Sequence, residues 1–363
     1  MLLYTTAMKV QDLISDNFYS VERLDPDDAK GKGYQRLLNV ARAKKLAEYI
    51  VKGQDSRDAF LPTSVFLATD KEISFDEQTN TIEIDTAIVG PFSVVDGQHR
   101  LEGLKMAAAK DSRVQEFEVP VNIAVELPYL HQMSHFLIVN TTQKSVDKAV
   151  EQRIIARLTE AWELDNLPNL PKWIERIVDR GDVNKAVKLV DFLNVEESSP
   201  WRGKISMANS DKNGATINQR SFVKAVEKYV LTVNNPLPKI FQDADKENKA
   251  FLNYWKAIAS KLDDGNPSVL YKYIGVELFC KFSMPFFVRL QNRGSYTVDT
   301  MQELLSACFD NLEGEYAGLS HPDWWTSGSA GGASFINSGA INQIYHDMTN
   351  ALHKSSGTEN IEL

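Results

Sequence analysis

The sequence predicts an α+β protein in which a mixed α/β domain comes first and a mainly helical domain follows it. Up to about residue 150, short apolar strand-like runs interleave with helical patterns. Several neighbouring runs are joined by short polar turns, as in hairpins, which argues against a doubly wound parallel sheet. From about residue 146 the apolar spacing is helical. We therefore expect an α/β domain over residues 1–150, a helical domain over 151–350 and a flexible polar tail over 351–363.

In the first domain, residues 40–51 have apolar side chains at helical spacing, and Asn39 is placed to cap that helix. Residues 101–110 are also helix-forming, while the apolar run 136–139 fits a strand or a helix. The polar residues 76–80 separate two strand candidates and predict a hairpin over 71–85. The predicted strands are residues 64–69, 72–75, 81–85, 92–95 and 118–126.

The second domain is predicted from one apolar stripe and several later helical patterns. The stripe consists of Val146, Val150, Ile154, Ile155 and Leu158. Further helices are expected at residues 173–179, 219–231, 251–261, 268–287 and 298–312. Residues 194–214 are polar and are predicted to form a loop.

Composition restricts the class of protein. The 363 residues are 43% hydrophobic and 25% charged, which is typical of a globular protein. Cys280 and Cys308 lie in apolar helical patterns and are expected to be buried, reduced thiols. No apolar run is long enough to cross a bilayer, and the N-terminus lacks signal-peptide features, so we expect a cytoplasmic protein without a membrane partner. The net charge of −9 argues against nucleic-acid binding by the whole surface but permits a local basic face.

The residues most indicative of function are Asp96, Gly97, Gln98, His99 and Arg100, which lie between a predicted strand and a predicted helix. Glycine allows close approach of a ligand to the backbone, and a helix start offers unpaired N–H groups. We expect His99 and Arg100 to add cationic donors, which would make this turn a phosphate site. The alternative interpretation is an ordinary helix cap at Asp96 and a surface ion pair at Arg100.

Residues 96–100 resemble the signature of the DGQHR-domain family, which includes the DndB proteins of bacterial DNA phosphorothioation systems. Other segments extend the resemblance: residues 34–37 and 42–50 look like the family's entry segment and first helix, 61–68 like an early strand, 136–144 like a second polar motif and 331–338 like the DndB-type tail.

This resemblance implies a ParB/sulfiredoxin-like fold for the first domain. In that fold a Gly-x-x-Arg turn at a helix start holds nucleotide phosphates, and Gly97 and Arg100 have that spacing. The catalytic cysteine of sulfiredoxin has no counterpart, because Gln98 lies between Gly97 and His99. The resemblance also implies a regulator that binds double-stranded DNA at the promoter of a phosphorothioation gene cluster. Other proteins of that system, and further copies of the chain, are candidate partners.

Further residues are expected to surround a nucleotide or phosphate at this turn. Arg36 precedes the first helix, and the other candidates form a second polar wall: Asn140, Thr141, Thr142 and Lys144. Hydroxyl, amide and ammonium groups at a helix start suit phosphate or base contacts. The alternative is a simple helix cap by Thr142 or Ser145, and both roles can hold together.

Basic residues after position 144 are candidates for DNA contacts. They are Lys148, Arg153, Arg157, Arg202, Lys204 and Arg220. Arg220, Lys224 and Lys228 also share the spacing of one helical face, and Trp201 is a candidate to stack on or wedge between bases. The alternative for each group is a solvated helix face with scattered counter-charges.

The leading hypothesis is thus a DndB-like, DNA-binding transcriptional regulator with a nucleotide or phosphate pocket. An alternative is an enzyme that hydrolyses ATP or another nucleoside triphosphate, or nicks DNA, with Mg²⁺. Asp96 would then hold the metal, His99 would act as acid or base and Arg100 would stabilise developing charge. A third hypothesis is a module whose pocket binds nucleotide only to set its conformation, with partner proteins as the output.

Overall fold

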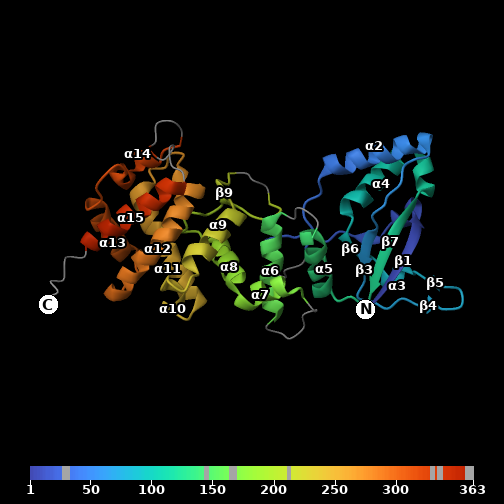
Figure 1. Cartoon of the computed structure of the whole chain (residues 1–363), viewed down its shortest axis with the longest axis horizontal. Coiled ribbons are helices and arrows are strands. Elements are labelled where there is room, and N and C mark those ends of the chain that lie inside the picture. The colour runs from blue at the N-terminus through green and yellow to red at the C-terminus, as the bar shows by residue number, and fades with distance from the viewer. Residues whose placement is uncertain are drawn as a thin grey trace. The chain divides into compact units, whose positions relative to one another are not determined.

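The computed structural model describes residues 1–26, 33–142, 147–162, 170–210, 214–327, 332 and 338–355. The chain folds into two compact units, Met1–Asp179 and Arg180–Leu363. The first unit contains a small sheet with helices, and the second is built mainly from helices (Figure 1). The structure therefore confirms the α+β class.

The sheet of the first unit is mixed. Its strands are β1 (Leu2–Lys9), β2 (Tyr19–Ser20), β3 (Val65–Ala68), β6 (Phe92–Asp96) and β7 (Glu118–Val125). They lie in the order β1-β7-β3-β6-β2. β7 runs antiparallel to β1 and parallel to β3, while β6 runs antiparallel to β3 and parallel to β2. Two of the four strand pairs are thus parallel, and the sheet that the described residues form is not doubly wound.

Helices and a hairpin complete the first unit. They are α1 (Val10–Leu13), α2 (Val40–Ser56), β4 (Phe75–Asp76), β5 (Thr81–Ile82), α3 (Thr86–Val89), α4 (Gln98–Lys110), the 3₁₀ turn η1 (Ser112–Glu116), α5 (Tyr129–Thr142) and α6 (Lys148–Trp162). α7 (Lys172–Arg180) ends at the boundary between the units. β4 and β5 pair antiparallel, which confirms the predicted hairpin.

α2 and α4 lie side by side in the first unit (Figure 1). Asn39 caps α2 by accepting from the backbone N–H of Arg42 at 3.1 Å, as the sequence predicts. Gly103 allows the close packing, since a Cβ there would lie 2.9 Å from Leu46 Cδ2 and 3.0 Å from the Ala43 carbonyl oxygen. Helix α4 is therefore held against α2, and its first turn is fixed in position.

Residues 136–139 are helical, because they belong to α5. The strand interpretation of this run is therefore wrong, and the helix interpretation is correct. Phe136 and Leu137 are buried on one side of α5, while Ile138 and Val139 are only partly buried. A continuous apolar run of four residues does not distinguish a buried strand from a helix by its period.

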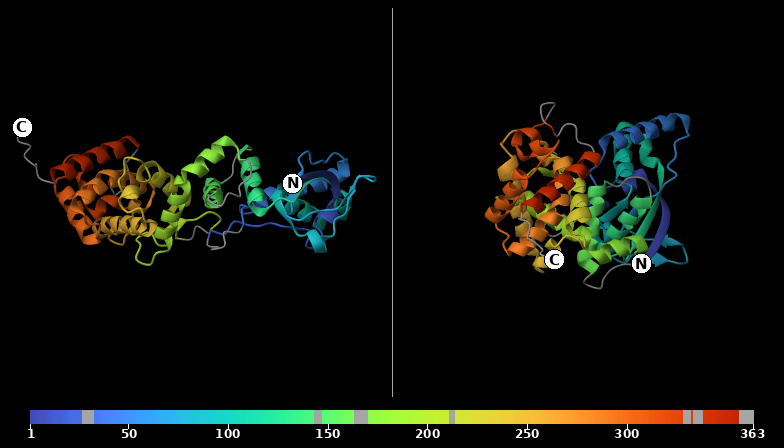
Figure 2. Two further views of the ribbon diagram at one scale, coloured as in Figure 1. Left: turned by 90° about the horizontal axis from the view of Figure 1, so that it is seen from below. Right: turned by 60° about the vertical axis from the view of Figure 1, so that its left-hand side comes forward.

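The second unit consists of helices and one short strand pair. Its elements are α8 (Asp182–Val195), β8 (Ile205–Ser206), β9 (Ile217–Asn218), α9 (Gln219–Ala225), the π-helical turn η2 (Val226–Val230), α10 (Leu237–Ile240), α11 (Ala244–Leu262), η3 (Val269–Tyr271), α12 (Tyr273–Arg293), α13 (Val298–Asp310), η4 (Ala317–Ser320), α14 (Pro322–Trp325) and α15 (Ser338–Lys354). α13 packs on α11 and on α15, and α15 also packs on α12 (Figure 2).

An aromatic core holds the second unit together. Trp201 is fully buried, with its ring centroid 4.7 Å from that of Phe222 and 4.9 Å from that of Trp255. The expectation that Trp201 stacks on or wedges between bases is therefore wrong. Cys280 and Cys308 are buried free thiols, as predicted, and burial raises the pKa of each. Within the residues that the structure describes, no helix is long and apolar enough to span a membrane.

Candidate functional site: the turn between β6 and α4

The turn is built on a glycine in a left-handed conformation. β6 ends at Asp96, Gly97 has a φ of 109°, and α4 starts at Gln98. A Cβ on Gly97 would lie 3.3 Å from Val65 Cα and 3.3 Å from Arg100 Nε, so the position is crowded as well as conformationally special. The strand therefore turns directly into the helix, as the sequence predicts.

Asp96 and Arg100 form an ion pair across this glycine. Arg100 Nη2 lies 2.6 Å from Asp96 Oδ2, and Arg100 Nη1 donates to Thr63 Oγ1 at 2.7 Å. The two side chains are only 27% and 21% exposed, for Asp96 and Arg100 respectively. The guanidinium is thus held by the protein's own groups, as the ion-pair interpretation expects, and a phosphate would have to replace the Asp96 carboxylate to bind it.

His99 is a neutral hydrogen-bond acceptor in this turn. The backbone N–H of Asn39 donates to His99 Nε2 at 2.9 Å. Burial lowers the pKa of His99 to about 4, and the charges of Arg36 and Arg42 act in the same direction. With Nε2 accepting, the neutral ring carries its proton on Nδ1. The expectation that His99 adds a cationic donor is therefore wrong. The sequence pattern does not show that His99 becomes half-buried beside Arg36 and Arg42.

Three arginines surround His99. Arg36, Arg42 and Arg100 each lower its pKa, whereas Asp96 opposes them. Arg36 is itself half-buried, and its pKa is lowered by burial and then by Arg42, against the pull of Asp96 and Asp147. We call Arg36, Arg42 and Arg100 the arginine cluster. It concentrates positive charge at the start of α4, where the helix dipole adds to it.

The segment that carries Arg36 is fixed to β6 and α4 by two glutamines. Gln35 is 1% exposed, and its Nε2 donates to the carbonyl oxygens of Val94 at 2.6 Å and of Val95 at 3.0 Å. Gln98 Nε2 donates to the Arg36 carbonyl oxygen at 3.2 Å. The roles of Gln35 and Arg42 could not be predicted from the sequence, since each is an ordinary polar residue near a helix start.

The predicted second wall is only partly visible. Asn140 Nδ2 donates to the Phe136 carbonyl oxygen and Thr141 Oγ1 to the Leu137 carbonyl oxygen, both at 2.8 Å. Both side chains thus bond back along α5, and in the described part of the chain neither bonds to residues 96–100. Lys144 and the side chain of Thr142 lie outside the described residues.

The predicted DNA-contacting residues of α6 are mostly engaged. Arg153 is only 6% exposed, so its expected place on an exposed basic face is wrong. Arg157 donates to the carbonyl oxygens of Gly33 and Asp25 and thereby ties α6 to the N-terminal segment. Lys148 is exposed and pairs with Glu151 at 2.6 Å. The helical spacing alone could not distinguish buried Arg153 from a surface residue.

In the second unit, the predicted DNA-contacting residues differ in exposure. Arg202 and Arg220 are exposed. Lys204 is half-buried with its Nζ 3.3 Å from the centroid of the Tyr271 ring, and burial lowers the pKa of Lys204. Arg202 and Arg220 therefore stay available for contact with a ligand, while Lys204 is packed against an aromatic ring.

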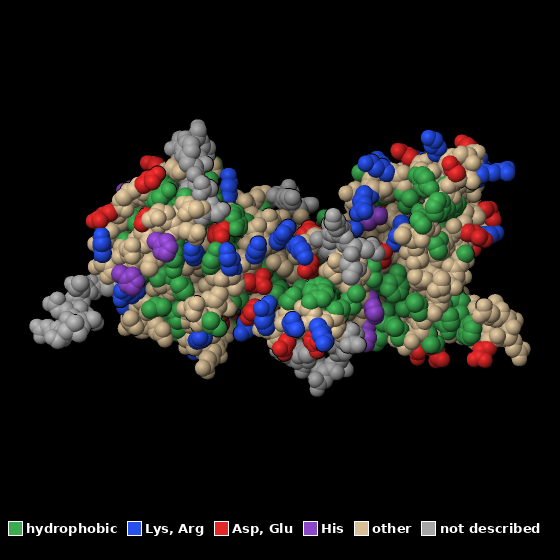
Figure 3. All heavy atoms as spheres, viewed as in Figure 1, with side chains coloured by type: hydrophobic (Ala, Val, Ile, Leu, Met, Phe, Trp, Pro, Cys, Tyr) green, Lys and Arg blue, Asp and Glu red, His purple; other side chains and the backbone are tan. Residues whose placement is uncertain are grey.

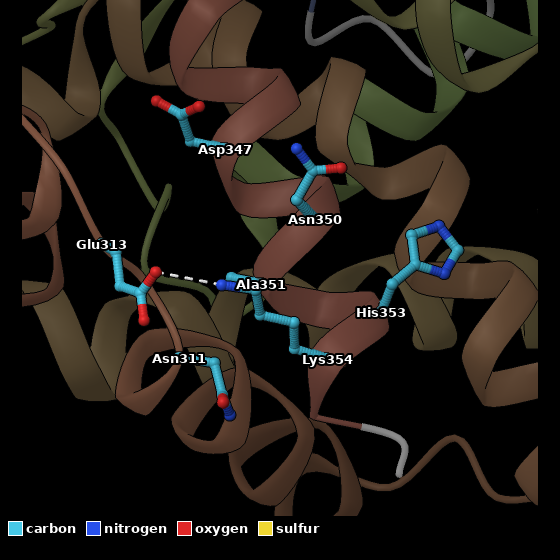
Figure 4. Close-up of a pocket in the computed structure, with 7 residues that line it drawn as sticks. All are labelled: Asn311, Glu313, Asp347, Asn350, Ala351, His353 and Lys354. Carbon is cyan, nitrogen blue, oxygen red and sulfur yellow. Dashed lines mark hydrogen bonds and ion pairs between the residues drawn. The ribbon is translucent and has the colours of Figure 1, made fainter. Parts of the chain in front are cut away.

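Two open hollows lie elsewhere. One, of about 530 Å³, lies between the ends of α13 and α15, where Lys354 and Glu313 pair at 3.0 Å across it (Figure 4). The other, of about 520 Å³, lies in the first unit beside Phe60 and Arg113. Neither includes the turn. Among the described residues, no three His, Cys, Asp or Glu side chains are grouped to hold a metal ion, and Asp96 Oδ2 is engaged by Arg100.

A comparison with protein families matches most of the first unit. Residues 2–153 match the family model of DndB, which is described as DNA-sulfur modification-associated. A search of the curated proteins and a search of the solved structures each returned no match. The matched residues include the whole sheet, the turn and the arginine cluster, whereas the second unit lies beyond the match. Over residues 2–153 the chain is therefore similar to the DndB family, whose description is DNA-sulfur modification-associated.

Proposed function

We propose that this chain is a DNA-binding regulator of a bacterial DNA phosphorothioation gene cluster, with a phosphate site at the turn of residues 96–100. The family match supports the link to DNA-sulfur modification. The regulatory role and the promoter as target are proposals that extend this match. Double-stranded DNA is the proposed partner, together with other proteins of the same system.

The observation that carries the phosphate site is the arginine cluster. Its charges help to hold the pKa of His99 near 4, within a chain whose net charge is −9. A local positive potential in an acidic protein attracts anions while the rest of the surface repels them. A phosphate also carries several acceptor oxygens, which suits the two-pronged guanidinium groups of Arg36, Arg42 and Arg100.

A phosphate at this turn would compete with the carboxylate of Asp96. Arg100 gives one Nη to Asp96 and the other to Thr63, so it can exchange one anionic acceptor for another without leaving its place. The proposed site is thus preassembled but occupied by the protein's own acid. Lys148, Arg202 and Arg220 are exposed cations that we propose as DNA contacts outside the turn.

The first test compares binding of promoter DNA and of phosphate by matched variants. Arg36→Ala and Arg42→Ala each remove one charge of the cluster, and we expect at least a several-fold loss of affinity for inorganic phosphate and for the promoter duplex. Lys105→Ala is the control. Lys105 is exposed on α4, and its substitution removes the same charge outside the arginine cluster. Affinities are measured by calorimetry and by gel retardation.

Equal affinities in the cluster variants, the control and the wild type would refute the phosphate site. The same samples are incubated with ATP, Mg²⁺ and supercoiled plasmid. Release of phosphate or nicking by the wild type, lost in Arg36→Ala, would contradict a purely regulatory function. Retardation of the promoter duplex without turnover is the result that we expect.

A further inference from the structure

The second unit carries a surface that combines lysines with tyrosines. Helix α9 passes into the π-helical turn η2, and η2 packs on α12. Lys224 and Lys228 are exposed on α9 and η2, and Tyr273 is 50% exposed at the start of α12. Lys281 follows two turns further along α12. We call Lys224, Lys228, Tyr229, Tyr273 and Lys281 the lysine–tyrosine face.

Glu277 lies at the centre of this face. It is 14% exposed, and its Oε1 accepts from Tyr229 Oη at 2.9 Å and lies 3.7 Å from Lys228 Nζ. Tyr273 also bonds to Glu277, which raises the pKa of Tyr273 to about 12. The hydroxyls of two tyrosines and one ammonium group are thus oriented by a single carboxylate.

The two lysines at the middle of the face are held in fixed positions. Lys228 Nζ lies 4.6 Å from the centroid of the Tyr229 ring. Lys281 Nζ donates to Asn342 Oδ1 at 2.6 Å and lies 4.3 Å from the centroid of the Tyr345 ring on α15. Burial and the nearby charge of Lys228 both lower the pKa of Lys281. Two ammonium groups are therefore kept near each other with one acid between them.

The positive charge continues along α9. Arg220 and Lys224 lie one turn apart, and among the described residues neither forms an ion pair. Four helical residues rise about 6 Å, so Arg220, Lys224 and Lys228 extend over roughly 12 Å. Figure 3 shows Lys and Arg side chains gathered over this part of the second unit. The row is long enough to neutralise several phosphates of one strand.

We propose that the lysine–tyrosine face, extended by Arg220, binds the phosphate backbone of double-stranded DNA without reading its sequence. Positioned ammonium groups suit phosphate oxygens. The proposed occupant is nucleic acid because a regularly spaced polyanion matches a row of cations. This inference rests on the proposed DNA-binding function, and it adds a contact in the unit that lies outside the family match.

The test is the salt dependence of DNA binding by the full chain. A fluorescent duplex of about 30 base pairs, roughly three helical turns, is titrated between about 50 and 200 mM salt. The triple variant Lys224→Ala, Lys228→Ala and Lys281→Ala should bind at least tenfold more weakly at the lowest salt. The slope of log affinity against log salt concentration should be smaller in magnitude by about 2 to 3, because each lost phosphate contact reduces that slope by about 0.9.

Two further variants make the result specific. Lys246→Ala, Lys249→Ala and Lys261→Ala remove the same charge from exposed positions of α11 and should leave the slope unchanged. Glu277→Gln keeps an acceptor for the tyrosines but removes the carboxylate that competes with phosphate, so its DNA affinity should rise several-fold. A gain of affinity cannot come from misfolding.

The outcomes separate this inference from the proposed function. An unchanged slope in the triple variant, together with weak binding by Arg36→Ala, would overturn the lysine–tyrosine face and leave the turn as the DNA site. Failure of the wild-type chain to bind any duplex would overturn both. Preference of the face for an RNA of the same length over DNA would also contradict the proposal.

Discussion

His99 is uncharged at neutral pH because burial and the nearby arginines oppose its protonation. Its Nε2 accepts the backbone N–H of Asn39, and an imidazolium could not do so. Protonation would therefore break the bond between the first turn of α4 and the start of α2, and it would add a fourth positive charge to the arginine cluster.

This arrangement predicts an acid-sensitive stability. The pKa of His99 is near 4 in the folded chain and about 6.5 when unfolded, so the unfolded state binds more protons between these values. The stabilisation is complete above about pH 6.5 and is lost as the pH falls towards 4. After discounting for solvent screening, we expect about 1 to 2 kcal/mol.

The measurement is urea unfolding of the wild type and of His99→Gln at pH 7 and at pH 4.5. Glutamine keeps an acceptor oxygen but does not titrate in this range. The wild type should lose more stability than the variant between the two pH values. Parallel losses would show that His99 is not the responsible group.

The sequence was sufficient to locate the turn but not to predict the charge state of His99. The spacing of Gly97 and Arg100, and the apolar strand before them, were sufficient to locate a strand–turn–helix junction. The protonation of His99 depends on Arg36 and Arg42, which are distant in the sequence and come close only in the fold. Arg153 shows the same limit, since its burial depends on what packs over α6.

At the scale of elements, the junction of β6 and α4 depends on Gly97. An alanine there would have to adopt a φ of 109° with its Cβ 3.3 Å from Val65 Cα. We expect Gly97→Ala to lower the free energy of unfolding by about 2 to 3 kcal/mol and to weaken phosphate binding. Denaturant unfolding and phosphate titration measure the two effects.

Gly294 provides the matched control. It has a φ of 67° at the end of α12, and a Cβ there would meet no atom within 4 Å. Gly294→Ala should therefore cost only the conformational strain, about 1 kcal/mol, and should leave phosphate binding unchanged. Equal losses of stability in the two variants would contradict a crowded turn at Gly97.

Elements with a cap or a clear period could be predicted, and others could not. The helix from residue 40 has Asn39 as its cap and was placed correctly, as were the strands that became β3, β6 and β7. α8 and α15 were not identified. α8 contains four valines, at positions 183, 187, 190 and 195, and β-branched residues favour strands. The segment is helical because tertiary packing overrides this preference.

At the scale of the whole molecule, each unit has a core of its own. The first is built from the sheet and the helices on it, including Leu67, Phe92 and Ile123. The second surrounds Trp201 and Trp255. Separate cores are the basis for separate cooperative unfolding.

We therefore expect two transitions in calorimetry of the full chain. Gly97→Ala should lower the temperature of one, and Phe222→Leu, in the aromatic core of the second unit, should lower the other. A single transition that both substitutions move would contradict independent cores.

The sequence predicts a domain boundary near residue 150, where the apolar spacing becomes helical. In the structure, the two compact units divide after Asp179.

The place of β7 in the sheet determines when the first unit can form during synthesis. β7 pairs with β1 on one side and β3 on the other, and Leu2 lies opposite Val125. More than a hundred residues must therefore be synthesised after β1 before its partner strand β7 is available. At ribosomal speeds this delay is about 5 to 20 seconds. A nascent chain that stalls before β7 emerges exposes an unpaired apolar strand, so slow translation or truncation in this interval should favour aggregation over folding.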